Sequence, residues 1–196
     1  MKCVDNEWLA IYQRGIDWYY KGFDEKAIEE FKKSISINPD AAVVYHDLGI
    51  VLFTKQCFKE AFVSFKKAVT LDKRMASAWL NGGNVLCAMN RFEEAIQWIR
   101  QALEIKPDYA DAHYNLGNVY KTKEAFHEAL TCYQRTLAIE PSYAEAHNNS
   151  GIILLKRGIF DEALKCFEAA IALNSACHQC YNAALHRLLR CPPAVM

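Results

Sequence analysis

The sequence predicts an all-α protein, a right-handed α-solenoid of antiparallel helix pairs, because two residue types recur along it at one constant interval. Glycine returns every 34 residues within the chain of 196 residues, and alanine returns at the same interval, always twelve positions after a glycine. The glycines are Gly15, Gly49, Gly83, Gly117 and Gly151, and the alanines are Ala27, Ala61, Ala95, Ala129 and Ala163. Such an interval indicates copies of one supersecondary unit, which stack to bury their apolar faces.

Each copy contains two helices, as the segment 113–141 illustrates. Apolar residues recur at steps of three and four up to Tyr120, the pattern breaks over residues 121–124, and it resumes from Phe126. Proline at the end of the unit, here Pro141, has a fixed φ and lacks an N–H, so it ends the second helix. The pattern therefore predicts helix, turn and helix in every unit.

The interval also fixes the expected domain organisation. A lead-in of residues 1–7 precedes five units, and residues 178–190 form a capping helix before a tail of residues 191–196. The units are residues 8–41, 42–75, 76–109, 110–143 and 144–177. Glycine on the first helix and alanine on the second let two backbones approach closely. A large residue four positions after the alanine, such as Phe65, fills the space around them.

In this register the chain resembles the tetratricopeptide repeat family over nearly its whole length. The family has a large aromatic residue at the fourth position of a unit, which Tyr45 and Trp79 match, and Ile11, His113 and His147 do not. It has leucine before the glycine, which is kept as Leu48 and Leu116 and replaced by Arg14, Gly82 and Ser150. We expect these replacements to weaken single units without shifting the register. The resemblance implies a concave groove, lined by the first helices, that binds proteins or peptides.

Carboxamides recur on the first helices, two residues before the glycine, as Asn81, Asn115 and Asn149. Asn84 and Asn118 lie about one turn further along the same face. Asparagine both donates and accepts hydrogen bonds, so such a series suits the backbone of an extended peptide. It is similar to the asparagine ladder of O-linked N-acetylglucosamine transferases, which implies peptide binding. The alternative is that these side chains hydrogen-bond a neighbouring helix.

The two ends of the predicted groove differ in character. Tyr12 and Ile16 in the first unit and His46 and Ile50 in the second favour a hydrophobic anchor, or contact with a second copy of the chain. The remaining predicted groove residues are Asp111, Tyr114 and Glu145. A carboxylate clamp for the acidic C-terminal tails of heat-shock chaperones needs lysine where Ser77, Asp111 and Glu145 stand. We therefore predict that such tails are not bound.

Composition argues against several other classes of function. Lys plus Arg and Asp plus Glu each total 23, so no basic surface predicts nucleic-acid binding. No segment approaches the roughly 20 apolar residues of a membrane span, and we expect a cytoplasmic protein without a cofactor. Cys177, Cys180, His186 and Cys191 have nearly the spacing of a zinc knuckle. Cys180 and His186 fall six residues apart on one expected helix and do not share a face, so we predict no metal site.

The candidates for catalysis fall at packing positions of the repeat. His113 and His147 take the place of the family aromatic, while Cys132 and Cys166 are equivalent to Trp98. The sequence therefore predicts a non-catalytic module that binds an extended peptide or partner segment. Two alternatives remain at this point: a self-associating structural scaffold, and an accessory subunit that presents substrates to a separate enzyme.

Overall fold

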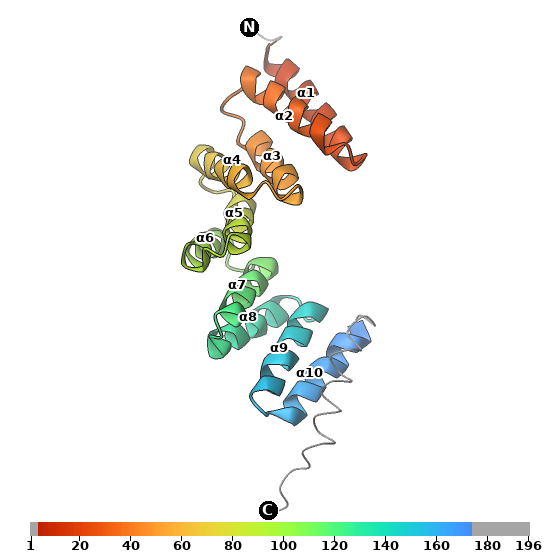
Figure 1. The fold of residues 1–196 in the computed structure, drawn as a ribbon, viewed down its shortest axis with the longest axis vertical. Coiled ribbons are helices and arrows are strands. Elements are labelled where there is room, and N and C mark those ends of the chain that lie inside the picture. Colours follow the sequence, from red (N-terminus) through yellow and green to blue (C-terminus); the bar gives the residue numbers. More distant parts are fainter. Residues whose placement is uncertain (1–3, 174–196) are drawn as a thin grey trace, which may run out of the picture. The chain divides into compact units, whose positions relative to one another are not determined.

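The computed structural model describes residues 4–173, and the regular structure of this part of the chain is entirely helical (Figure 1). The helices there are α1 Val4–Tyr20, α2 Asp24–Ile37, α3 Ala42–Thr54, α4 Phe58–Leu71, α5 Ala76–Ala88, α6 Phe92–Ile105, α7 Ala110–Thr122, α8 Phe126–Ile139, α9 Ala144–Lys156 and α10 Phe160–Leu173. Every one of them is too short or too polar to serve as a membrane span. The expected capping helix at 178–190 and tail at 191–196 lie outside the described residues. The fold is the predicted all-α helical repeat.

The first helices begin close to the expected unit boundaries. Helices α3, α5, α7 and α9 begin at Ala42, Ala76, Ala110 and Ala144, which are the expected first residues of their units. Helix α1 differs, because it begins at Val4 and so includes part of the segment expected as a lead-in, residues 1–7. Val4, Trp8 and Ile11 already stand at helical spacing in the sequence, which explains the earlier start.

The helices form two compact parts, which we describe separately. The N-terminal half contains α1 to α6 and ends at Pro107, and the C-terminal half begins at Asp108 and contains α7 to α10. Within each half the two helices of a unit pack side by side, as α1 with α2 or α9 with α10 (Figure 1). The second helix also contacts the first helix of the next unit: α2 contacts α3, α4 contacts α5, and α8 contacts α9. Each pair thus covers the apolar face of its neighbour.

Close approach between the paired helices is confirmed at every unit. In the pair α3 and α4, a Cβ added to Gly49 would lie 2.8 Å from Cε1 of Phe65, and Ala61 and Phe65 are both buried. The equivalent contacts join Gly15 to Phe31, Gly83 to Ile99, Gly117 to Tyr133 and Gly151 to Phe167. The recurring glycine therefore provides the room for one buried large side chain in each pair.

Two replacements of the family leucine are compensated from the second helix. A Cβ on Gly82 would collide with the Trp98 ring, so the indole of α6 occupies the space that leucine would fill. Arg14 Nε lies 3.0 Å from Glu30 Oε2, which joins α1 to α2 by an ion pair. At both units the opposing position of the second helix therefore carries a side chain that contacts the replacement, and the weakening of single units stays a prediction.

The turn inside each unit has a residue of positive φ at the same repeat position. These residues are Gly22 and Gly158 at 77°, Gln56 at 61°, and Asn90 and Glu124 at 59°. Around Gln56, the N–H of Cys57 donates to the carbonyl of Leu52 and that of Gln56 to Phe53, both at 2.9 Å. This is the Schellman pattern that ends helices on a left-handed residue. Only glycine adopts that conformation without steric cost.

Replacing Gln56 with glycine is therefore expected to stabilise the N-terminal half. Relief of the left-handed conformation contributes about 1–2 kcal/mol, and the greater freedom of glycine in the unfolded chain takes back about 0.4–1 kcal/mol. The midpoint of urea unfolding should rise for Gln56→Gly. The matched change is Gly22→Ala, whose new Cβ has no atom within 4 Å. Its midpoint of urea unfolding should fall only because alanine is disfavoured at positive φ. A lower midpoint for Gln56→Gly contradicts this account.

Candidate functional site

The twelve groove residues predicted from the sequence all lie on first helices. In the N-terminal half they are Tyr12 and Ile16 on α1, His46 and Ile50 on α3, and Asn81 and Asn84 on α5. In the C-terminal half they are Asp111, Tyr114, Asn115 and Asn118 on α7, with Glu145 and Asn149 on α9. We call each of these two sets the first-helix face of its half.

A row of hydrogen bonds crosses the first-helix face of the N-terminal half. Tyr12 OH donates to Asp47 Oδ2 at 2.6 Å, and His46 Nδ1 donates to Asp47 Oδ1 at 2.8 Å. Because a carboxylate only accepts, the ring proton of His46 lies on Nδ1, and Nε2 accepts from Asn81 Nδ2 at 3.2 Å. Burial and the bond to Asp47 raise the pKa of Tyr12, so its phenol stays a donor. The row links α1, α3 and α5.

Three of the hydrogen bonds between neighbouring first helices share one sequence offset. Tyr12 to Asp47, His46 to Asn81 and Tyr114 to Asn149 each join residues 35 positions apart. This offset is one repeat plus one residue, so the fifth position of one unit meets the sixth position of the next. Within each half, the recurring polar position before the glycine therefore ties neighbouring units together.

In the C-terminal half, Asn149 is committed to such ties. Its Nδ2 donates to Tyr114 OH at 3.1 Å and to Asn118 Oδ1 at 3.0 Å, while its Oδ1 accepts from Lys121 Nζ at 2.9 Å. Tyr133 OH donates to the same Asn118 oxygen at 2.8 Å. Asn149 is only 8% exposed, and both of its amide hydrogens are used. Asn149 therefore hydrogen-bonds a neighbouring helix, which was the alternative to peptide binding in the sequence analysis.

Lys121 brings a partly buried cation to this network. Burial and the nearby charge of Lys156 lower the pKa of Lys121. Asp111 and Glu145, both exposed, add carboxylates to the same face, and Tyr143 OH donates to Asp111 at 3.0 Å. Sequence reasoning missed Lys121, although it stands three residues after Asn118 on the same helix face.

A small pocket lies on the first-helix face of the N-terminal half. Its volume is about 120 Å³, and it is lined by Ile16, Tyr19, Tyr20, Phe31, Asp47, Ile50 and Val51. Ile16 and Ile50 belong to the apolar end that the sequence predicts. Asp47 does not, and its carboxylate gives the pocket one charged group. The signal for it was present, because Asp47 stands at the repeat position that asparagine occupies in the later units.

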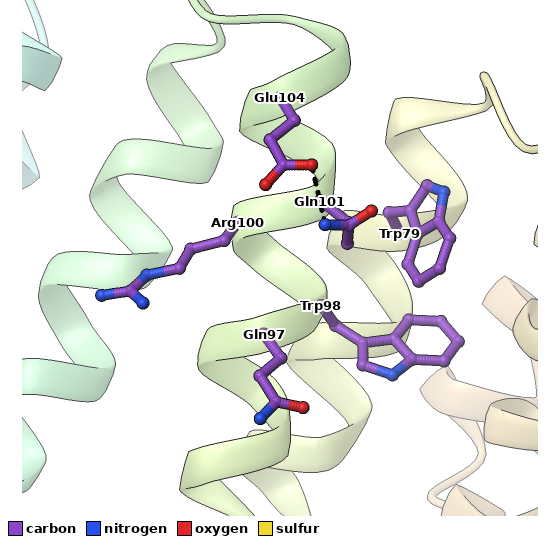
Figure 2. Close-up of a pocket in the computed structure, with 6 residues that line it drawn as sticks. All are labelled: Trp79, Gln97, Trp98, Arg100, Gln101 and Glu104. Atoms are coloured by element: carbon purple, nitrogen blue, oxygen red, sulfur yellow. Dashed lines mark hydrogen bonds between the residues drawn. The ribbon is translucent and has the colours of Figure 1, made fainter.

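A larger hollow, of about 380 Å³, lies beside α6 in the same half (Figure 2). Trp79 and Trp98 form one side, with ring centroids 4.8 Å apart, and Gln101 Nε2 donates to Glu104 Oε2 at 2.8 Å (Figure 2). Trp79 Nε1 donates to the carbonyl of Lys73 at 3.0 Å. The two indoles thus join α5 to α6.

Among residues 4–173, no three His, Cys, Asp or Glu side chains are arranged to hold a metal ion. The four residues of the zinc-like spacing, Cys177, Cys180, His186 and Cys191, lie outside the described residues. Burial raises the pKa of the Cys87 thiol to about 11 and also raises that of Cys166. Both thiols are therefore protonated at neutral pH and are poor nucleophiles.

Family models of the tetratricopeptide repeat match this chain. Residues 83–124 match the family described as TPR repeat, and residues 110–143 and 144–177 match the Tetratricopeptide repeat. No curated protein matches the sequence. A crystal structure of MamA is similar with a TM-score of 0.76 and 28% identity, over 84% of this chain and 96% of that one.

Two further solved structures share the fold at lower identity. PilF of Pseudomonas aeruginosa has a TM-score of 0.80 and 21% identity, over 99% of this chain and 96% of its own. YrrB, described as a TPR protein with an unusual peptide-binding site, has a TM-score of 0.72 and 21% identity, over 93% and 92%.

Proposed function

Because this chain is a tetratricopeptide repeat protein, we propose that it is a non-catalytic interaction module that binds an extended segment of a partner protein along its first-helix faces. Its repeats make it a protein-interaction module in general terms. The proposal adds the surface that is used and the form of the ligand. A peptide-binding site is compatible with this fold, since YrrB is described as having one.

The observation that carries the proposal is the pocket next to the row of hydrogen bonds in the N-terminal half. The pocket is bounded by residues of α1, α2 and α3, and Asp47 in its wall belongs to the row, where it accepts from Tyr12 and His46. Side chains that are already held lose little conformational entropy when a ligand binds. The face therefore offers a preorganised surface with one anchoring cavity.

Asn81 is suited to contact the main chain of the ligand. One of its amide hydrogens is used by His46, and its Oδ1 accepts no hydrogen bond from any residue in 4–173. That oxygen is available to accept from a peptide N–H, in contrast to the committed amide of Asn149. We assign Asn81 as the peptide contact of the N-terminal half, and Asn115, at the same repeat position, as the contact that the sequence predicts in the C-terminal half. Asn149 instead holds Tyr114, Asn118 and Lys121 in place.

The test uses peptides selected from a phage-displayed random library on the intact protein. Their synthetic, fluorescein-labelled copies should bind the variant Asn81→Ala/Asn115→Ala more weakly. Two lost hydrogen bonds of about 0.5–1.5 kcal/mol each correspond to a roughly 5- to 140-fold lower affinity, which fluorescence anisotropy measures.

The matched control is Gln97→Ala/Gln134→Ala, which removes one exposed carboxamide from a second helix in each half. This control should bind the peptides as the natural chain does, and both variants should keep its circular dichroism spectrum. The proposal is overturned if no peptide is enriched, or if the asparagine variant retains full affinity. It is also overturned if the glutamine variant loses as much affinity, because binding then involves the second helices.

A further inference from the structure

We infer that the pocket on the first-helix face of the N-terminal half receives an arginine or lysine side chain of the bound segment, with the cationic group at Asp47. This inference rests on the proposed function, because it identifies which residue of the segment is anchored. It also changes the expectation from the sequence, which predicted a hydrophobic anchor at this end.

The charge of the pocket supports a cation. Asp47 accepts from the Tyr12 phenol and from His46, whose ring is neutral when Nε2 accepts from Asn81. In the described part of the chain, neither lysine nor arginine forms an ion pair with Asp47, and the ring of His46, which is charged only when protonated, is its basic neighbour at 2.8 Å. A carboxylate offers about four acceptor sites, two on each oxygen. One on each remains, so the carboxylate can accept further hydrogen bonds from a guanidinium or ammonium group.

The size of the pocket supports the end of one side chain. Its volume of about 120 Å³ equals that of about four water molecules, at roughly 30 Å³ each. Sites for whole small molecules are larger, about 300–1,000 Å³. The pocket is therefore filled by a single guanidinium or ammonium group with part of its stem.

The walls support a cation on an aliphatic stem. Ile16, Tyr19 and Ile50 are apolar surfaces against which the methylene groups of arginine or lysine pack. Tyr20, which is 82% exposed, places an aromatic ring at the rim, where cations are attracted to ring faces. A purely apolar anchor would cover Asp47 without a partner for its charge. An acidic anchor would be repelled by it.

The experiment uses the peptides enriched by phage display, synthesised with acetylated N-termini so that their α-amino groups carry no charge. We expect the enriched peptides to share one arginine or lysine. Replacing that residue by citrulline, the neutral isostere of arginine, should lower affinity for the natural chain at least about tenfold, since the lost bonds are charge-assisted. On the variant Asp47→Asn, the arginine and citrulline peptides should bind equally.

The matched control is Asp17→Asn, which removes an exposed carboxylate of α1 that does not line the pocket. It should preserve the preference for arginine over citrulline. If enriched peptides lack a basic residue, or if citrulline binds as well as arginine, the inference is overturned while binding along the face stands. If no peptide is enriched, both fail. If Asp47→Asn does not fold, the affinities of the arginine and citrulline peptides for the natural chain still decide whether the inference holds.

Discussion

Replacing Phe65 with alanine is expected to lower the free energy of unfolding by about 3–5 kcal/mol, the usual cost of emptying a large buried aromatic site. Phe65 is 1% exposed and fills the space that Gly49 leaves between α3 and α4. The two backbones already meet at Gly49, so neighbouring atoms have little freedom to close the cavity. The ring also packs edge-on against His46, with centroids 5.8 Å apart. Loss of the ring should therefore also loosen the row of hydrogen bonds and weaken the proposed peptide binding.

Urea unfolding followed by circular dichroism measures this effect. Because each helix pair contacts only its neighbours, we expect the variant to unfold over a broader range of urea, with the pair α3 and α4 separating first. The control Val63→Ala changes an exposed residue of the same helix and should stay within about 0.5 kcal/mol of the natural chain. A loss below about 1.5 kcal/mol for Phe65→Ala, outside the range for such sites, shows that the site collapses around the missing ring.

The second large effect concerns the exchange of volume between Gly82 and Trp98. The variant Gly82→Leu should cost about 3 kcal/mol, because its side chain enters the space of the Trp98 ring. The variant Trp98→Cys should cost about as much, since Trp98 also packs against Phe62 and Trp79 with centroids 4.9 and 4.8 Å away.

The double variant Gly82→Leu/Trp98→Cys copies the pair that the fourth unit has at these positions, Leu116 and Cys132. It should be less destabilised than the sum of the single variants by at least about 1 kcal/mol, because the new leucine fills the vacated space. Urea unfolding by circular dichroism under reducing conditions measures all three proteins. In the control cycle, Ala88→Leu at an exposed site of α5 should add to Trp98→Cys without coupling. Equal additivity in both cycles contradicts the exchange.

Much of the fold was predictable because the repeat is visible in the spacing of residues along the sequence. Constant spacing of Gly49 and its equivalents gave the register, and the apolar residue four positions after each alanine gave the partner that packs on it. The positive φ at Gln56 was not predictable from its residue type, since glutamine rarely adopts that conformation. Only the alignment of Gln56 with Gly22 and Gly158 at one repeat position indicates it.

The helices that carry the candidate site residues were predictable from the sequence. The hydrogen-bond partners of these residues were less so. The sequence located the polar residues on the first helices, and the structure brings Tyr12, His46 and Asn81 together there. The sequence did not reveal that the Asn149 amide forms hydrogen bonds within the C-terminal half. These bonds require Tyr114, Asn118 and Lys121 to lie within reach of Asn149 at once. Hydrogen-bond partners are chosen by side-chain rotamers in three dimensions, which spacing along a helix does not specify.

By itself, the sequence determined the class of the fold, the positions of the helices and the helix face on which the polar residues recur, because each depends on periodicity along one chain. The tertiary structure alone decided which side-chain amides form hydrogen bonds within the protein and where a carboxylate lines a pocket. Those outcomes depend on side chains from successive units meeting across space. Asp47 illustrates the difference, since in sequence it is one polar residue in a repeating column, and in the folded protein it is the charged group of the pocket.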